Sequence, residues 1–103
     1  MAEAGRLTAA GPGMYELAGT VGFGDAARLL AEGDRAFAPL RAVEVDLARV
    51  TRIDSAGLAL LIEWSLAARA AGRQIRYRNV PPAVTSLAGI SDVSELLMGS
   101  AAG

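Results

Sequence analysis

The sequence predicts a single α/β domain with a small mixed β-sheet of about four or five strands. A glycine-proline turn between two β-prone segments near the start of the chain favours an antiparallel hairpin. A strand–helix–strand pattern in the second half favours parallel strands. The chain has 103 residues, of which 52% are hydrophobic, which is enough for one core but leaves little room for a second domain. We expect the domain to span residues 1–103, with its core within residues 6–98 and frayed ends.

The predicted hairpin has its strands at residues 8–10 and 14–21. Between them, Pro12 lacks a backbone N–H and the glycine on each side permits positive φ, so this segment favours a turn. Alternation along the second strand divides its side chains between two faces, and the apolar face consists of Tyr15, Leu17, Gly19 and Val21.

A helix is predicted after the hairpin. Asp25 is expected to cap its start, and Pro39 is expected to end it. Apolar or small residues recur at spacings of three and four, which is typical of a buried helix face, and they are Ala26, Leu29, Leu30, Gly33 and Phe37.

A strand–helix–strand unit follows. A short valine-rich strand is predicted at residues 43–47, and residues 48–53 lead from it into a long helix that begins at residues 54–55. Gly72 is expected to end that helix after about Ala71, and residues 74–78 alternate as the next strand. The helix between the two strands is too long to be the turn of a hairpin, so the strands should be parallel and joined by a right-handed crossover.

The last part of the chain is predicted to contain one more short helix. Pro81 or Pro82 opens it and Gly89 ends it, with Val84, Leu87 and Ala88 on its apolar side. Residues 90–98 fit either an edge strand or a helical turn, and their sequence leaves that choice open.

Composition excludes most common catalytic machinery. The chain has no Cys and no His, so Cys and His zinc sites, thiol nucleophiles and Ser-His-Asp triads are ruled out. All 10 basic residues are Arg, and the net charge of −1 provides no broad positive field for nucleic acid. The first residues lack a hydrophobic signal core, so we expect a cytoplasmic protein without direct membrane insertion. No cofactor or metal is expected.

Two segments resemble the signature of the STAS-domain family. They are residues 43–47, VEVDL, and residues 53–58, IDSAGL, which match a strand ending in Asp-Leu and an Asp-Ser/Thr-x-Gly-Leu turn that opens a helix. The resemblance implies one STAS domain, in which the helices pack mainly on one face of the sheet. Residues 19–30, GTVGFGDAARLL, are similar to the MlaB-like branch of this family.

The resemblance to this branch implies a cytoplasmic subunit of an Mla-type phospholipid-trafficking ABC transporter. Its partner would be the ATPase subunit, with the permease in the assembled complex, and its role would be in phospholipid transport and outer-membrane lipid asymmetry. The alternative is an anti-sigma-factor antagonist whose partner kinase phosphorylates Ser55. Ser55 departs from the Thr that is common in the MlaB-like branch, and Gly22 stands where many members of the STAS-domain family have an acidic residue.

The candidate partner-binding site is the turn formed by Asp54, Ser55, Ala56 and Gly57. Ser55 lies where a helix exposes unpaired N–H groups, so its hydroxyl can cap the helix, contact a partner or accept a phosphate. The simpler interpretation is that Asp54 or Ser55 only caps the helix. Gly57 disfavours that interpretation, because a glycine in the first turn suggests a close approach by backbone or by a partner.

Two further sets of residues are candidate binding surfaces. A second apolar stripe on the long helix consists of Leu60, Trp64 and Ala67, and it either docks a partner or is covered by another helix. Four of the ten basic residues form a candidate anion patch, or else a solvated face: Arg69, Arg73, Arg76 and Arg78. No phosphate-cradling glycine-rich loop accompanies them.

One pair of acidic residues could support an enzymatic role. Asp46 and Asp54 stand near the ends of adjacent elements, where paired carboxylates can bind Mg²⁺ or transfer protons. Capping of a turn and of a helix explains them more simply, and the acidic pair and Lys of a phosphoacceptor site are missing. We therefore predict a protein without catalytic activity.

Overall fold

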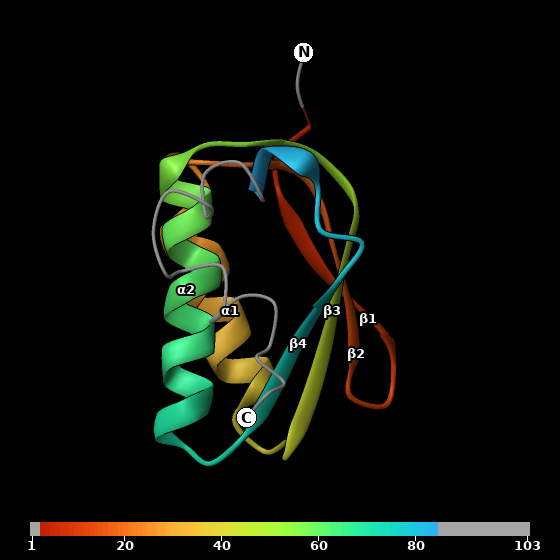
Figure 1. The fold of residues 1–103 in the computed structure, drawn as a ribbon, viewed down its shortest axis with the longest axis vertical. Helices are drawn as coiled ribbons and strands as arrows, with labels where there is room; N and C mark the ends of the chain where they lie inside the picture. Colours follow the sequence, from red (N-terminus) through yellow and green to blue (C-terminus); the bar gives the residue numbers. More distant parts are fainter. Residues whose placement is uncertain (1–2, 85–103) are drawn as a thin grey trace.

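The computed structural model describes residues 3–84. Six elements follow one another along the chain (Figure 1): β1 (Arg6–Gly11), β2 (Met14–Val21), α1 (Ala26–Phe37), β3 (Ala42–Ile53), α2 (Ser55–Ala70) and β4 (Gln74–Arg78). This order confirms the predicted hairpin, the two predicted helices and the strand–helix–strand unit. β1 is longer than predicted at both ends, and β4 has the predicted bounds.

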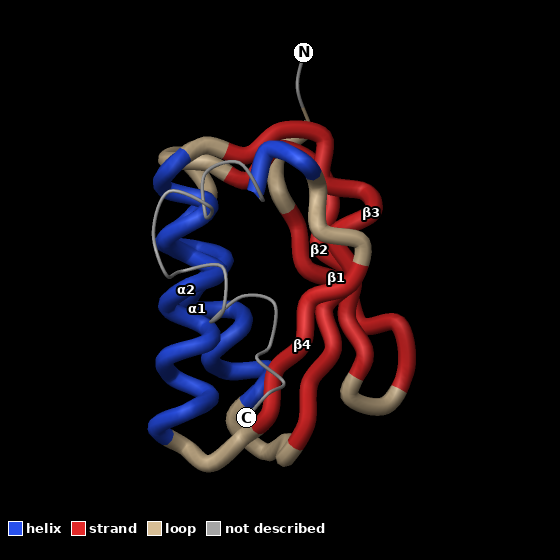
Figure 2. The backbone as a smooth tube through the Cα atoms, in the orientation of Figure 1, coloured by secondary structure: helices blue, strands red, loops and turns tan. Residues whose placement is uncertain are grey.

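One mixed sheet forms a layer against the two helices. The strands are ordered β1-β2-β3-β4, with β1 antiparallel to β2 and the other neighbours parallel. The antiparallel hairpin and the parallel β3–β4 pair confirm the prediction, whereas the sequence made no prediction for the pairing of β2 with β3. Figure 2 shows α1 and α2 side by side on the same face of this sheet, so the fold has two layers. The starts of both helices and the ends of β2 and β3 lie at the same edge of the molecule. This is the edge at which open α/β sheets most often bind ligands.

β3 corrects the prediction that strand structure ends at Leu47. The strand continues to Ile53, which pairs with Val21 of β2. Its pairing with β2 shifts register twice, between Glu16 and Ala18 and between Gly19 and Thr20, and each shift places an additional β3 residue opposite β2. Such bulges interrupt the two-residue alternation of a strand. The irregular pattern of residues 48–53 therefore gave no strand signal.

The core lies between the sheet and the helices. It is formed by residues of every described element except β1 and β4, which contribute only partly buried side chains. The fully buried side chains of greatest volume are Trp64, Leu17, Leu29, Leu47, Leu61, Val21, Val45 and Val84. The predicted apolar faces of β2 and α1 are confirmed, because Leu17, Val21, Leu29 and Phe37 all belong to this core.

The predicted helix after β4 is confirmed only at its start. A helical turn begins at Pro82, and the N–H of Val84 donates to the Pro81 carbonyl at 3.0 Å. The rest of that helix and residues 90–98 lie outside the described residues.

Candidate functional site

Asp54 joins the start of α2 to the loop between β2 and α1. Its Oδ1 accepts a hydrogen bond from the Gly57 N–H at 3.0 Å, and its Oδ2 accepts one from the Phe23 N–H at 3.3 Å. The first bond is a helix N-cap, as predicted. These bonds favour the carboxylate, and the Gly57 bond above all lowers the pKa of Asp54 below its ordinary value of 3.8. One side chain therefore anchors two segments.

Ser55 is the first residue of α2 and is exposed. Because Asp54 provides the cap, the hydroxyl of Ser55 has no capping role, and among residues 3–84 it forms no hydrogen bond. The hydroxyl also lies next to the partial positive charge of the helix N-terminus. The hydroxyl is therefore available for a partner or for modification.

Two glycines explain the shape of this site. A Cβ on Gly57 would overlap the Val21 carbonyl oxygen and would lie 2.6 Å from Cγ1 of Ile53, so the first turn of α2 packs directly on the end of β2. The close approach predicted for Gly57 is thus an approach of the chain's own backbone. A Cβ on Gly22 would lie 2.7 Å from Oδ2 of Asp54. An acidic side chain at Gly22 would therefore displace and repel the carboxylate that holds the loop.

Phe23 was missed in the sequence. Its side chain is 87% exposed, although its backbone N–H is held by Asp54. A Phe between two glycines, just beyond the apolar end of a strand, is the signal that was available. Aromatic residues are enriched in protein interfaces relative to the rest of the protein surface, so Phe23 is a candidate contact residue.

The predicted docking stripe on α2 is wrong. Leu60 is 3% exposed and Trp64 is 1% exposed, and both belong to the core. The reason is α1, which covers this side of α2: the ring of Phe37 meets the Trp64 indole edge-on at 5.3 Å, and Gly33 packs against the indole with no space for a Cβ. Ala67, the third member of the stripe, is exposed.

A different side of α2 faces outward. Ala59 is exposed, Ile62 is half-buried and Leu66 is 45% exposed. These residues follow Ser55 at spacings of four, three and four, which places all of them on one side of the helix. We call the exposed side chains of Phe23, Ser55, Ala59 and Leu66 the docking surface.

The four predicted anion-binding arginines do not form one patch. Arg69 is in the last turn of α2, and Arg73 donates to the carbonyls of Leu40 and Ala38 at 3.1 and 3.4 Å. Arg76 and Arg78 are on the other face of β4 from Tyr77, whose hydroxyl donates to the Leu61 carbonyl of α2.

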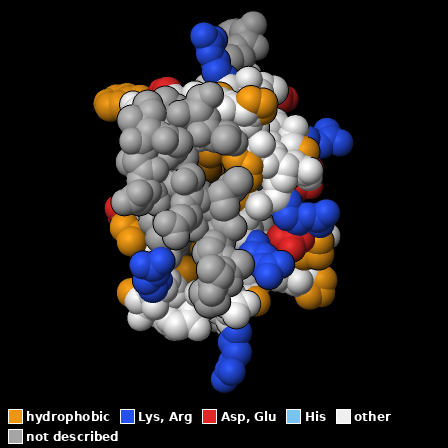
Figure 3. All heavy atoms as spheres, viewed as in Figure 1, with side chains coloured by type: hydrophobic (Ala, Val, Ile, Leu, Met, Phe, Trp, Pro, Cys, Tyr) orange, Lys and Arg blue, Asp and Glu red, His pale blue; other side chains and the backbone are white. Residues whose placement is uncertain are grey.

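Two ion pairs join neighbouring strands on that open face of the sheet. Arg78 forms an ion pair with Glu44 at 3.1 Å, and Arg49 forms one with Glu16 at 3.2 Å. On the face drawn in Figure 3, basic side chains are likewise spread apart, and some lie beside acidic ones. The arginines that were grouped by sequence therefore belong to separate surroundings.

Asp46 and Asp54 have separate partners, in agreement with the capping interpretation. Asp46 Oδ1 accepts from the N–H of Ala48 and from the side-chain amide of Asn79, each at 2.9 Å. The Asn79 bond, followed by the Ala48 bond, lowers the pKa of Asp46. Within residues 3–84, no three acidic side chains converge as metal ligands. No helix in that range is both long and apolar enough to cross a bilayer.

Comparison with protein families gives one match over most of the chain. The family model described as "Mlab, STAS domain" matches residues 7–98. Among curated proteins, none matches the chain.

Solved structures agree with this family at the level of the fold. The phosphorylated form of SpoIIAA, a Bacillus cell fate determinant, is similar over 92% of this chain and 89% of its own, with a TM-score of 0.70 and 15% identity. The unphosphorylated form of SpoIIAA, an anti-sigma factor antagonist, is similar over 85% and 84%, with a TM-score of 0.66 and 14% identity. The murine anion transporter Slc26a9 is similar over 81% of this chain but only 14% of its own, with a TM-score of 0.62 and 18% identity.

Proposed function

We propose that this chain, which belongs to the family described as "Mlab, STAS domain", is a non-enzymatic subunit of an Mla-type ABC transporter. It binds the ATPase of that transporter in the cytoplasm, and through the complex it is peripheral to the inner membrane. Its role is to support phospholipid transport and outer-membrane lipid asymmetry. The observation that supports this proposal most is an exposed phenyl ring, Phe23, whose backbone N–H is held by Asp54, the residue before the free hydroxyl of Ser55.

Phe23 has the properties of an interface anchor. Its backbone is tied to Asp54, so part of the entropy cost of ordering the loop is met before a partner binds. Burying the ring in an apolar pocket of a partner would contribute about 1.5–3 kcal/mol. Aromatic residues in such positions account for much of the affinity of protein interfaces.

The rest of the docking surface favours a protein partner over a small molecule. Ala59 and Leu66 extend the exposed surface along α2 from Ser55, with the exposed carboxylate of Glu63 between them, and a mixed apolar and polar helix side of this kind is suited to contact with another folded protein. The polar groups nearest to it, such as Asp54, are occupied by hydrogen bonds within the domain. The surface is thus arranged for contact and not for proton transfer or nucleophilic attack.

A phosphorylation-dependent antagonist of an anti-sigma-factor kinase is the second candidate function. The observation that favours it is the exposed hydroxyl of Ser55, which is not used as the helix cap. A phosphate on Ser55 would add about −1.5 to −2 charges next to the carboxylate of Asp54. The helix N-terminus tolerates that charge, but an apolar or acidic partner surface would not.

Affinity capture from the native host distinguishes the two functions. Tagged wild-type protein and the Ser55→Asp and Phe23→Ser variants are compared, and mass spectrometry identifies the partners and the modification state of Ser55. We expect an ABC ATPase and its permease with unmodified Ser55, and weaker recovery with both variants. Recovery of a serine kinase together with phosphorylated Ser55 would replace the transporter function by the antagonist function. Equal recovery by all three proteins would exclude the docking surface.

A further inference from the structure

A short segment before β1 packs across the end of β2. We call residues 3–5 the strap. The Thr20 N–H donates to the Glu3 carbonyl at 2.9 Å, and Ala4 forms a β-bridge with Thr20. Gly5 is buried, and a Cβ on it would lie 2.6 Å from the Thr20 carbonyl oxygen and 3.1 Å from Leu29. The strap can therefore occupy this position only because residue 5 has no side chain.

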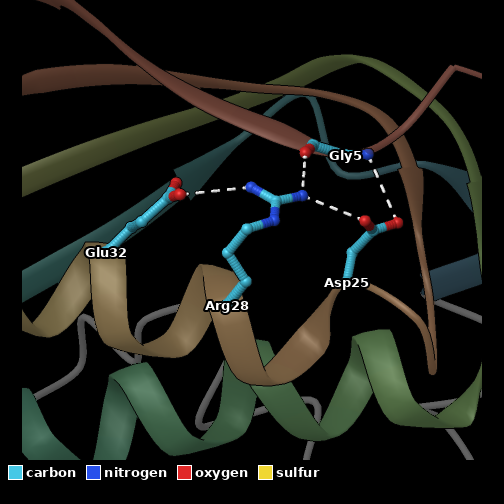
Figure 4. Close-up of polar contacts among 4 residues, drawn as sticks. All are labelled: Gly5, Asp25, Arg28 and Glu32. Atoms are coloured by element: carbon cyan, nitrogen blue, oxygen red, sulfur yellow. Dashed lines mark hydrogen bonds and ion pairs between the residues drawn. The ribbon is translucent and has the colours of Figure 1, made fainter.

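The N–H and the carbonyl of Gly5 are both hydrogen-bonded at the start of α1, to its N-cap residue Asp25 and to Arg28 in its first turn (Figure 4). The Gly5 N–H donates to Oδ2 of Asp25 at 3.3 Å, and the Gly5 carbonyl accepts from Nη2 of Arg28 at 2.6 Å. The same Nη2 donates to Oδ1 of Asp25 at 2.9 Å, and Nη1 contacts Glu32 at 3.2 Å. The guanidinium fork thus completes a ring that joins the strap to α1.

This ring changes the expected role of Asp25. Asp25 occupies the N-cap position of α1, but its side chain forms no capping bond, which corrects the prediction from the sequence. Both of its carboxylate oxygens are engaged with Gly5 and Arg28 instead. A capping function has therefore been replaced by a connection to the strap.

Two hydrogen bonds anchor the loop that bears Phe23. We call residues 22–24 the Phe23 loop. Asp54 holds the N–H of its middle residue, Phe23, and the N–H of Asp25 donates to the Gly22 carbonyl at 2.9 Å, which closes the loop as a turn. A Cβ on Gly24 would have no atom within 4 Å, so the last residue of the loop is not packed on that side. The position of Asp25, and hence of the strap, sets the second anchor.

We infer that Gly5, Asp25 and Arg28 are positioning residues that hold the Phe23 loop in the conformation that presents Phe23 to the partner. This inference rests on the proposed function, because it assigns the strap a role in forming the docking surface. Within residues 3–84, no hydrogen bond or ion pair joins the strap to α2, so its effect on a partner would pass through the loop.

The test compares three variants of the full chain. Gly5→Ala displaces the strap, and Arg28→Met removes the guanidinium fork while it keeps a long apolar stem. Arg35→Met is the matched control, because Arg35 is exposed on the same helix and has no ion pair or hydrogen bond within residues 3–84. If Gly5→Ala does not fold, Arg28→Met alone decides.

The first readout is the NMR order parameter of the Phe23 and Gly24 amides in the isolated protein. We expect it to fall from about 0.85, typical of rigid backbone, to below about 0.6 in Gly5→Ala and Arg28→Met, while amides of β3 and the Arg35→Met protein stay unchanged. The second readout is the Kd for the ATPase recovered by affinity capture, which should rise about tenfold in the first two variants and not in the control.

Unchanged order parameters in both strap variants would overturn the inference, as would a mobile loop with an unchanged Kd. Failure of the wild-type protein to bind any ATPase would instead contradict the proposed function. In that case the order parameters still decide whether the strap holds the loop, so the two failures are distinguishable.

Discussion

At the residue scale, Asp54 connects the two segments that bear the docking surface, the loop with Phe23 and the start of α2. The sequence was sufficient to predict its N-cap bond, because an Asp before the first turn of a helix is a common signal. Its second bond, to the Phe23 N–H, joins residues 31 positions apart in the chain. Local patterns contain no information on such a contact, so the role of Phe23 could not be predicted with that of Ser55.

The lowered pKa of Asp54 leads to a prediction on pH. Because the folded-state pKa lies below 3.8, the stabilisation from this carboxylate is present above about pH 4 and is lost as the pH falls through the folded pKa. Asp54→Asn keeps a capping side chain but has no charge to titrate. We expect the urea midpoint of the wild type to exceed that of Asp54→Asn at about pH 6, and the gap to shrink at about pH 3. A gap that is independent of pH would contradict this role.

Trp64 provides the second prediction at this scale. The indole is buried against Phe37, so Trp64→Ala should lower the free energy of unfolding by about 3–5 kcal/mol. Leu66→Ala is the control, since Leu66 is 45% exposed on the same helix, and it should change stability by about 1 kcal/mol or less. Urea denaturation measures both. A Trp64→Ala protein as stable as Leu66→Ala would show that Trp64 is not part of the core.

At the element scale, the packing of α1 on α2 decides which side of α2 faces a partner. The apolar pattern of α2 extends around so much of the helix that the sequence predicted two candidate buried sides. Which of them α1 covers depends on Gly33, which lets the helices approach until Trp64 lies against backbone. That approach is a tertiary property and is not visible in the pattern of either helix alone.

Gly33→Ala tests this close approach. Alanine is favoured over glycine in a helix by about 1 kcal/mol, so propensity alone predicts a more stable protein. The added Cβ would overlap the Trp64 indole, and overpacking of this kind costs about 1–3 kcal/mol. We expect a net loss of stability by thermal or urea unfolding. Gly24→Ala, at a site with open space, should be nearly neutral, and a stabilising Gly33→Ala would contradict the packing.

The strands show the same division between local and distant information. The turn at residues 11–13 and the alternation of β2 and β4 were sufficient to predict the hairpin and the parallel pair. The second half of β3 could not be predicted, because its two bulges remove the alternation on which a strand assignment depends.

At the scale of the whole molecule, the two sides of the fold differ in chemistry. The open face of the sheet has ion pairs between neighbouring strands, such as Arg78–Glu44, and is suited to water. The edge where both helices begin has an exposed phenyl ring and a free hydroxyl, next to the outward side of α2. The family and the fold were predictable from residues 43–47 and 53–58, whereas this contrast required the arrangement of all six elements.

The most direct test of the central claim is the Kd of the purified ATPase for the wild type, Phe23→Ala and Met14→Ala. Met14 is also an exposed apolar side chain, 41% exposed, but it lies at the opposite end of β2 from the docking surface. If the partner binds at the docking surface, Phe23→Ala should weaken binding by at least about tenfold while Met14→Ala leaves it unchanged. Equal affinities of all three proteins, or a loss confined to Met14→Ala, would contradict docking through Phe23.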